Sequence, residues 1–135
     1  MLTVDELMTR DLVTLKEDDD LVTGDDLLAE NNIRHLPVVK DGKLLGLVSH
    51  RDLIRALARQ ERVPGAPSVL VREIMTRGVE TLKPKSAVRE AIHKMLDNKF
   101  GCMPVVEDGG RLVGIITETD IIRLAGRLLE REERR

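Results

Sequence analysis

The run GLVSHRD at Gly46–Asp52 returns later in the chain as GIITETD at Gly114–Asp120. A Pro-Val-Val triplet precedes each run, at Pro37–Val39 and at Pro104–Val106, and an Asp-Gly pair lies between triplet and run in both places. Apolar, β-branched runs on both sides of an Asp-Gly turn are a strong hairpin signal. The sequence therefore predicts two hairpins, each leading into a motif that ends in Asp.

Outward from these runs the match continues with a nearly constant offset. Met8-Thr9-Arg10 falls on Met75-Thr76-Arg77, and one extra residue is needed near Gly110. Between 4–57 and 71–125 about a third of the paired positions are identical, which chance pairing would almost never produce. The chain therefore contains two copies of one unit, which implies two equivalent faces and a shared seam.

Composition limits the possible classes of protein. The chain has 135 residues, and we expect one intertwined domain rather than two independent lobes. Hydrophobic residues make up 41%, but with one Phe and no Trp or Tyr the core must consist of Val, Ile, Leu and Met. The net charge of -2 and the lack of stacking aromatic residues argue against nucleic acid as a partner.

The same features bear on the cellular location. A single cysteine, Cys102, allows no intramolecular disulfide bond. The N-terminus has no long apolar run, and no stretch approaches the length that spans a bilayer. We therefore expect a soluble, cytoplasmic protein without a membrane partner.

The start of each copy predicts a helix and a strand. Thr3–Glu6 has the spacing of a capping box, in which the Thr oxygen and the Glu carboxylate accept from free backbone amides, so a short helix should end near Met8. Short strands are expected at 12–15 and 79–82, each followed by a polar turn.

The long helices of the two copies differ in pattern. In the second copy an apolar stripe recurs at helical spacing, formed by Val88, Ile92, Met95 and Leu96. The first copy has Gly24, Asp25 and Asp26 where the second has Ala91, Ile92 and His93. We therefore expect the first long helix to start late or to be irregular.

Each copy thus reads helix, strand, helix, strand, strand, helix, which is an α/β (α+β) fold class. The remaining elements are expected as strands at 36–39, 44–48, 103–106 and 112–116 and as helices at 52–58 and 120–129. The expected domains are a first unit at 1–59, a linker at 60–68 with Pro64, Gly65 and Pro67, a second unit at 69–129 and a charged, fraying tail at 130–135.

This order of elements, with the Met-Thr start, the Pro-Val-Val strand and the Ser/Thr-x-x-Asp close, resembles the CBS domain, and two copies resemble a tandem CBS pair, or Bateman module. The resemblance implies two units packed sheet to sheet with pseudo-two-fold symmetry, leaving two clefts. It implies an adenosine compound such as AMP, ADP, ATP or S-adenosylmethionine in those clefts. It also implies a homodimer and a protein effector that the module regulates, here as a stand-alone module.

The chemistry of the two motifs fits such a ligand. The carboxylates of Asp52 and Asp120 can accept hydrogen bonds from the ribose hydroxyls, while Ser49 and Thr117 lie beside a helix N-terminus, which favours an anion. Both Ser/Thr-x-x-Asp motifs also have the shape of capping boxes, which would explain them without any ligand. Capping and binding therefore stay open for both motifs.

The resemblance implies that each cleft takes its motif from one copy and faces the long helix of the other. The first cleft then consists of Arg34, His35, Leu47, Ser49, Arg51, Asp52, Ser86, Ala91 and Leu112. The second consists of Leu44, Ile115, Thr117, Thr119 and Asp120, with Gly101 and Cys102, and faces Asp18, Asp19, Asp20 and Gly24. Since only the first set brings two arginines and a histidine, we expect it to bind the phosphorylated nucleotide. We expect the second to be empty, weak, or suited to a ligand with little negative charge. The alternative is that Arg34 and Arg51 are only solvated surface charges.

Other chemical signals are weak. Cys102 and the histidines His35, His50 and His93 show no pattern that makes a catalytic set, so no catalytic residue and no enzyme activity are expected. The acidic residues near Asp18–Asp20 do not match a calcium loop, so no dedicated metal site is expected, although Mg²⁺ can accompany a nucleotide. Gly46 and Gly114 are expected to allow close packing at the hairpins.

The function that the sequence favours is a regulatory module that senses an adenine nucleotide, with no cofactor required. The alternative is a structural dimerisation or scaffold module without a nucleotide ligand. Ligand-dependent stabilisation would separate the two.

Overall fold

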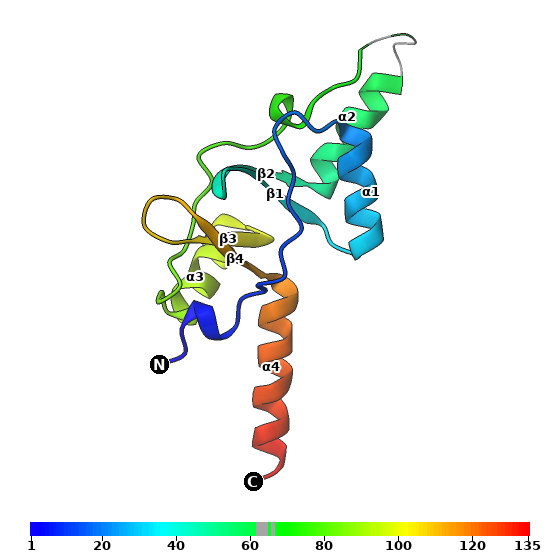
Figure 1. The fold of residues 1–135 in the computed structure, drawn as a ribbon. Helices are drawn as coiled ribbons and strands as arrows, with labels where there is room; N and C mark the ends of the chain where they lie inside the picture. Colours follow the sequence, from blue (N-terminus) through cyan, green and yellow to red (C-terminus); the bar gives the residue numbers. More distant parts are fainter. Residues whose placement is uncertain (62–64, 66) are drawn as a thin grey trace. The chain divides into compact units, whose positions relative to one another are not determined.

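The computed structural model describes residues 1–61, 65 and 67–135 (Figure 1). Part of the predicted linker at 60–68, including Pro64, lies outside the described residues. The chain forms two compact units. We call Val13–Val79 the first-hairpin unit, and Met1–Leu12 together with Glu80–Arg135 the second-hairpin unit.

These compact units do not coincide with the two sequence copies. The start of the first copy pairs with the hairpin of the second, because Thr9 N donates to Ile115 O at 2.9 Å. The start of the second copy pairs with the first hairpin in the same way, through Thr76 N and Leu47 O at 2.9 Å. Each compact unit therefore contains the opening segment of one copy and the body of the other.

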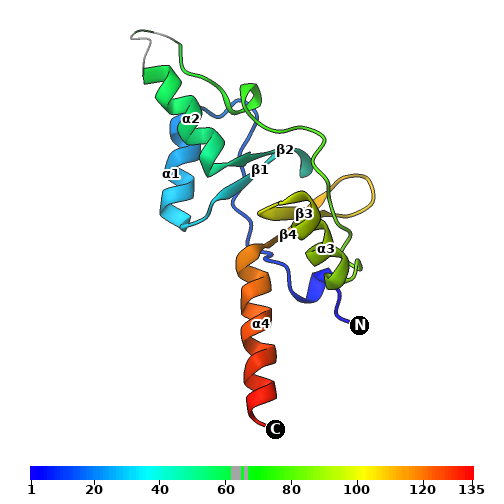
Figure 2. The same ribbon diagram turned by 180° about the vertical axis from the view of Figure 1, so that it is seen from behind.

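The first-hairpin unit consists of α1 (Leu21–Asn31), β1 (His35–Lys40), β2 (Lys43–Ser49), α2 (His50–Glu61) and the 3-10 turn η2 (Val71–Glu73). Helices α1 and α2 lie side by side next to the hairpin in Figures 1 and 2. Their apolar faces and the hairpin enclose an aliphatic core that includes Leu21, Leu36 and Leu53.

The second-hairpin unit consists of the 3-10 turn η1 (Val4–Glu6), α3 (Val88–Asn98), β3 (Cys102–Val106), β4 (Leu112–Thr117) and α4 (Glu118–Glu133). Its core is also aliphatic, with Val4, Met103 and Ile116 fully buried. Helix α4 continues from the end of β4, and its C-terminal half has no other element of this unit beside it (Figure 2). Several large apolar side chains of α4 are exposed: Ile122 (69%), Leu128 (52%) and Leu129 (63%).

The two hairpins confirm the prediction. Strand β1 pairs antiparallel with β2, β3 with β4, and both pairs shift register at the same place, between Val38 and Val39 and between Val105 and Val106. Asp41 and Gly42 both have a positive φ, of 52° and 79°, as the tight Asp-Gly turn requires. Helices together with two antiparallel hairpins confirm the predicted mixed fold class.

The strands predicted at 12–15 and 79–82 are much shorter in the structure than predicted. Each is reduced to a single parallel bridge, Leu15 with Val38 and Leu82 with Val105. After Leu15 the chain turns away from the hairpin, because Asp19 Oδ2 accepts a hydrogen bond of 2.8 Å from Lys16 N. Asp19 thus closes a turn that ends the pairing after one residue.

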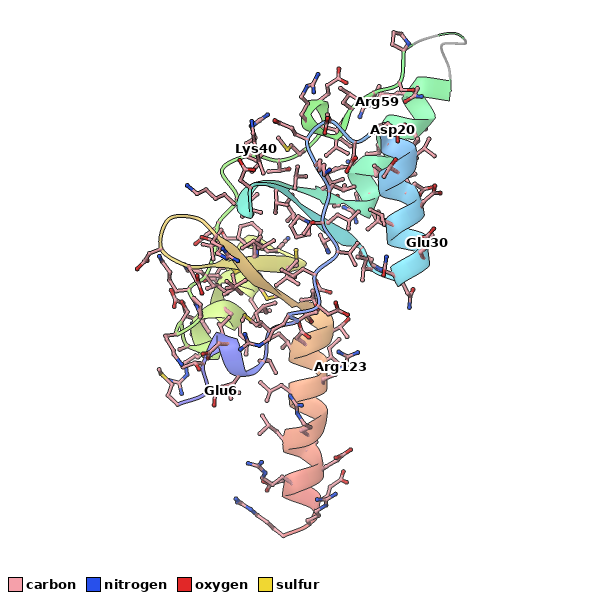
Figure 3. The ribbon with its side chains drawn as sticks, in the orientation of Figure 1. Glu6, Asp20, Glu30, Lys40, Arg59 and Arg123 are labelled. Atoms are coloured by element: carbon pink, nitrogen blue, oxygen red, sulfur yellow. The ribbon has the colours of Figure 1, made fainter. Side chains whose placement is uncertain are left out.

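The expectation of a late or irregular first long helix was also wrong. Helix α1 begins at Leu21, the position that corresponds to Val88 at the start of α3. The carboxylate of Asp20 caps the helix by accepting from Thr23 N at 2.9 Å (Figure 3). A Cβ on Gly24 would lie 3.3 Å from Leu53 Cδ1, so the glycine lets α1 pack closely on α2.

Smaller corrections concern the other helices. Leu96 of the predicted stripe is 72% exposed, and Ala91 is buried instead, because positions 88, 91 and 95 share the face of α3 that meets the core. At the first turn Glu6 accepts from Thr3 N at 2.7 Å as predicted, whereas the Thr3 hydroxyl donates to carboxylates and caps no amide. Helices α2 and α4 extend beyond the predicted 52–58 and 120–129. Residues 130–133 of α4 belong to the tail, which was expected as a fraying helix end.

The glycines in the hairpins are packed as predicted. A Cβ on Gly46 would lie 2.8 Å from Thr76 O, and one on Gly114 would collide with Met8. The opening segment of each copy therefore approaches a hairpin at the point where no side chain is in the way. No helix among residues 1–61, 65 and 67–135 is both long and apolar enough to span a membrane.

Candidate functional site

The first motif lies at the corner where β2 runs into α2. His35 and Ser49 are directly paired across the hairpin, and His50 N donates to Arg34 O at 2.8 Å. These backbone contacts bring both ends of the hairpin to the start of α2. We call Arg34, His35, Ser49, Arg51 and Asp52 the first corner.

The hydroxyl of Ser49 caps α2, because it accepts from Asp52 N at 3.2 Å. The reverse half of a capping box is not formed: no hydroxyl and no backbone N–H in the described part of the chain donates to the half-buried Asp52 carboxylate. Arg34 and Arg51 are exposed, and neither takes part in an ion pair with a described residue. The guanidinium groups of Arg34 and Arg51 are therefore not held in ion pairs by described residues, and the Asp52 carboxylate is not closed into a capping box.

The second motif lies at the matching corner between β4 and α4, with Gly101, Cys102, Thr117, Thr119 and Asp120, which we call the second corner. Its backbone repeats the first corner: Cys102 pairs with Thr117, and Glu118 N donates to Gly101 O at 3.2 Å. Its side chains form a complete capping box, since Thr117 N donates to Asp120 Oδ2 at 2.9 Å and Asp120 N to Thr117 Oγ1 at 3.3 Å.

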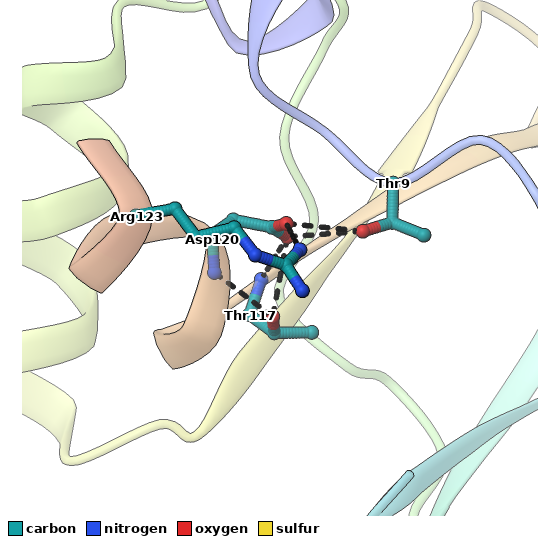
Figure 4. A network of polar contacts seen from close by, with 4 residues as sticks. All are labelled: Thr9, Thr117, Asp120 and Arg123. Carbon is teal, nitrogen blue, oxygen red and sulfur yellow. Dashed lines mark hydrogen bonds and ion pairs between the residues drawn. The ribbon is translucent and has the colours of Figure 1, made fainter. Parts of the chain in front are cut away.

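A residue from the opening segment completes this network (Figure 4). Thr9 Oγ1 lies 3.1 Å from Asp120 Oδ1 and 3.3 Å from Oδ2, and Arg123 Nη1 lies 3.9 Å from Oδ1. Asp120 is only 5% exposed. Both oxygens of its carboxylate therefore take part in contacts within the protein. The second motif forms both hydrogen bonds of a capping box, whereas the first forms only one of them.

Sequence reasoning did not assign Thr9 to either site. The Met-Thr-Arg repeat was a signal that this threonine matters, but its partner Asp120 lies 111 residues away. Only the pairing of the opening segment with β4 brings the two side chains together.

The other predicted residues lie as follows. Leu47 and Leu44 are partly buried in β2, whereas Ile115 is buried in β4 and Thr119 is exposed on α4. Ser86, Ala91 and Leu112 belong to the second-hairpin unit, where Ser86 Oγ accepts from Lys83 N at 3.0 Å and Ala91 is fully buried. Their assignment to the first site stays a prediction.

The structure accounts for the Cys102 thiol and for the acidic residues near Asp18–Asp20 without a catalytic or metal-binding role. Burial, with a smaller effect of Glu118, raises the pKa of the Cys102 thiol to about 12, so it is neutral at physiological pH. Asp19 and Asp20 are used in a turn and a helix cap. Among the described residues no three His, Cys, Asp or Glu side chains gather in a group that could hold a metal ion.

Comparison with known proteins adds independent information. The family model of the CBS domain matches the chain twice, at residues 4–59 and 71–127. The AcuB protein from Vibrio cholerae is 36% identical, with a TM-score of 0.89 and 98% of both chains covered. The CBS domain pair of protein MJ0100, in complex with 5′-methylthioadenosine and S-adenosyl-L-methionine, is 32% identical, with a TM-score of 0.82 over 93% of this chain and 97% of that one.

A third structure, CBSX2 from Arabidopsis thaliana, was solved in complex with AMP. It is 28% identical, with a TM-score of 0.83 over 95% of this chain and 98% of that one. The chain spans only 23% to 46% of the length of three curated relatives that it matches. Because two successive CBS domain matches cover most of its length, the chain belongs to the CBS domain family.

Proposed function

We propose that this protein is a regulatory module that binds an adenosine compound at the first corner, with Asp52 as the acceptor for the ribose. The observation that carries the proposal is the difference between the two motifs. Asp120 is held by Thr9 and Thr117, whereas Asp52 receives none of the corresponding bonds. An ionised carboxylate with unused lone pairs is a suitable acceptor for two vicinal hydroxyls.

The ligands of the solved relatives support the same chemistry. Protein MJ0100 is complexed with 5′-methylthioadenosine and S-adenosyl-L-methionine, and CBSX2 with AMP. These three molecules differ in charge and in the group at the 5′ position, but all contain adenosine with its 2′ and 3′ hydroxyls. The shared part is therefore the part that a carboxylate such as that of Asp52 recognises.

The charges at the first corner favour a phosphorylated adenosine compound. Arg51 lies in the first turn of α2, and the backbone of Arg34 is bonded to the start of the same helix, because Arg34 O accepts from His50 N. Ser49 directly precedes this helix, at its positive N-terminal end. At about 4 to 6 Å and partial screening, each cation contributes on the order of one to a few kcal/mol toward a phosphate. The second corner instead carries Glu118 and Asp120 with Arg123, so we propose weak or no nucleotide binding there.

The regulatory role is supported by the kind of ligand that the solved relatives bind. A nucleotide transmits a signal only by its difference in affinity for two shapes of the module, typically about 1 to 3 kcal/mol. We propose that a cytoplasmic protein effector reads this change. No covalent step is required, and Mg²⁺ is needed only if it accompanies the nucleotide's phosphates.

Thermal unfolding in the presence of AMP, ADP, ATP and S-adenosylmethionine tests the proposal. A ligand at a hundredfold its Kd should stabilise the wild-type protein by about 2.7 kcal/mol. Asp52→Ala should abolish most of this stabilisation, while Asp26→Ala, which removes an exposed carboxylate of α1 in the same unit, should keep it. If none of the four compounds raises the melting temperature of the wild-type protein, the nucleotide proposal is wrong.

The exposed apolar side chains of α4 favour a second candidate, a structural dimerisation module. Ile122 and Leu129 lie seven residues apart on one face, and both are more than half exposed. A second copy of the chain would cover this face in a homodimer. Ile122→Glu with Leu129→Glu should then halve the mass measured by light scattering, whereas the exposed polar control Arg127→Glu should not.

A further inference from the structure

The opening segment of each copy docks on the polar turn that precedes the long helix of the other copy. Asp5 N donates to Pro84 O at 2.8 Å, and Arg72 N donates to Glu17 O at 3.0 Å. Asp5 and Arg72 are equivalent positions of the two copies, and so are Pro84 and Glu17. Both segments are therefore held in the same backbone register, and this register alone does not distinguish one turn from the other.

The two turns differ in charge. We call 16–20, with one lysine and four carboxylates, the acidic turn, and 83–87, with two lysines and no carboxylate, the basic turn. The segment that lies on the basic turn has Asp5, and the segment that lies on the acidic turn has Arg72 at the same position. Each segment thus carries, at this position, the charge opposite to that of the turn on which it lies.

At the basic turn the two opposite charges are in contact. Lys85 Nζ lies 2.8 Å from Asp5 Oδ2. The hydrogen bond from Lys85 is the main cause that holds the pKa of the Asp5 carboxyl below its ordinary value. The neighbouring Glu6 and Glu73 each accept from a backbone amide of their own segment, at 2.7 and 2.6 Å, so they act alike in both copies. The difference between the two segments therefore rests on Asp5 and Arg72.

At the acidic turn the equivalent of Lys85 is Asp18. Asp18 and Arg72 are both exposed, and neither forms an ion pair in the part of the chain that the structure describes. Their attraction therefore acts through solvent, where it is screened by salt. The contact between segment and turn is thus repeated in the two copies with the signs of both charges reversed.

We propose that these reversed charges select the turn on which each opening segment docks. If the segment of the first copy docked on the turn of its own copy, in the same chain or in a second chain, Asp5 would meet Asp18. The segment of the second copy on its own turn would bring Arg72 to Lys85. Both incorrect dockings place like charges together, whereas both observed ones place opposite charges together. The surface of each turn therefore fits an opening segment of opposite charge, and this selection needs no bound nucleotide.

An exchange of charges that keeps the net charge at -2 tests the selection: Asp5→Arg with Arg72→Asp gives both segments the wrong charge. Docking is read from disulfide traps in the full chain. Thr3→Cys with Ala87→Cys reports correct docking, because Thr3 and Ala87 form an antiparallel bridge, whose Cα distance of about 4.5 to 5.5 Å suits a disulfide. Thr3→Cys with Asp20→Cys reports incorrect docking, since Asp20 is the equivalent of Ala87.

The folded, reduced protein is oxidised at low salt, and the cross-links are measured by mass spectrometry, with the buried Cys102 expected to stay out of them. The exchange should lower the ratio of correct to incorrect cross-links by about threefold to tenfold, because attraction and repulsion change places and each exposed pair contributes modestly. Adding Asp18→Lys with Lys85→Asp should restore the wild-type ratio. The control Asp26→Arg with Arg127→Asp, which exchanges the same charges on exposed faces of α1 and α4, should leave the ratio unchanged.

Salt gives an independent readout, since 1 M NaCl should remove most of the difference between the exchanged variant and the wild type. An unchanged ratio at low salt would mean that shape and not charge selects the turn, and the proposal would be wrong. Should the exchanged variant fail to fold, the variant with all four substitutions decides, because selection by charge requires that it folds and gives the wild-type ratio.

Discussion

Removing the carboxylate of Asp120 should destabilise the unliganded protein far more than removing that of Asp52. Asp120 is 5% exposed and accepts from Thr9 Oγ1, Thr117 N and Thr117 Oγ1, at 3.1, 2.9 and 3.2 Å. Hydrogen bonds to a charged group are worth about 1.5 to 3 kcal/mol each, and water restores part of this loss. We therefore expect Asp120→Ala to lower the free energy of unfolding by about 2 to 4 kcal/mol.

Asp52→Ala removes a half-buried carboxylate that no hydroxyl or backbone N–H of the described residues contacts. This carboxylate lies in the first turn of α2, where the interaction with the helix N-terminus is worth less than about 1 kcal/mol, so we expect its loss to cost about that much. Urea unfolding followed by circular dichroism gives both free energies by linear extrapolation, with the wild-type protein as reference. Equal losses for the two variants would refute the conclusion that only one motif is closed by the protein itself.

Three further predictions concern packing, reactivity and pH. Gly46→Ala places a Cβ 2.8 Å from Thr76 O and should lower the free energy of unfolding by about 1 to 3 kcal/mol, whereas Gly126→Ala, where a Cβ meets nothing, should not destabilise in the same urea assay. With its pKa raised to about 12, Cys102 should resist iodoacetamide at pH 8.5 until urea unfolds the protein; rapid alkylation of the native protein would contradict its burial. Hydrogen bonds from the Thr23 backbone and side chain lower the pKa of Asp20 below 3.8. Asp20→Ala should therefore lower the free energy of unfolding by its full amount at neutral pH, and this difference from the wild type should disappear as the pH falls below 3.8.

The local parts of the fold were predictable from the sequence. Both hairpins follow from short-range signals, because Asp-Gly turns and apolar runs specify pairing between neighbouring segments. The end-of-hairpin position of Arg34, His35, Ser49 and Asp52 follows from the register of β1 against β2. The start of α1 was predicted incorrectly, since Gly24 lowers helix propensity but packs against Leu53, and tertiary contact outweighs propensity.

The long-range contacts were not predictable in the same way. Nothing local to Thr9 shows that it meets Asp120, because that contact depends on the opening segment pairing with the hairpin of the other copy. The asymmetry between the corners was expected from the charges of Arg34 and Arg51, whereas the structure adds a different cause in the buried network around Asp120. The charges of side chains can be read from a sequence, but whether a carboxylate accepts hydrogen bonds within the fold cannot.

The exchange of opening segments has a consequence for how such a chain can arise. A lone copy lacks the opening segment of the other copy, which lies over its hairpin at Gly46 or Gly114, so this side of the hairpin stays uncovered. An ancestral protein with one copy could complete its hairpin only by borrowing that segment from a second molecule. Joining two genes end to end then turns an association that depends on concentration into an intramolecular one. It also frees each half to diverge, as the hydrogen bonds of the two motifs have done.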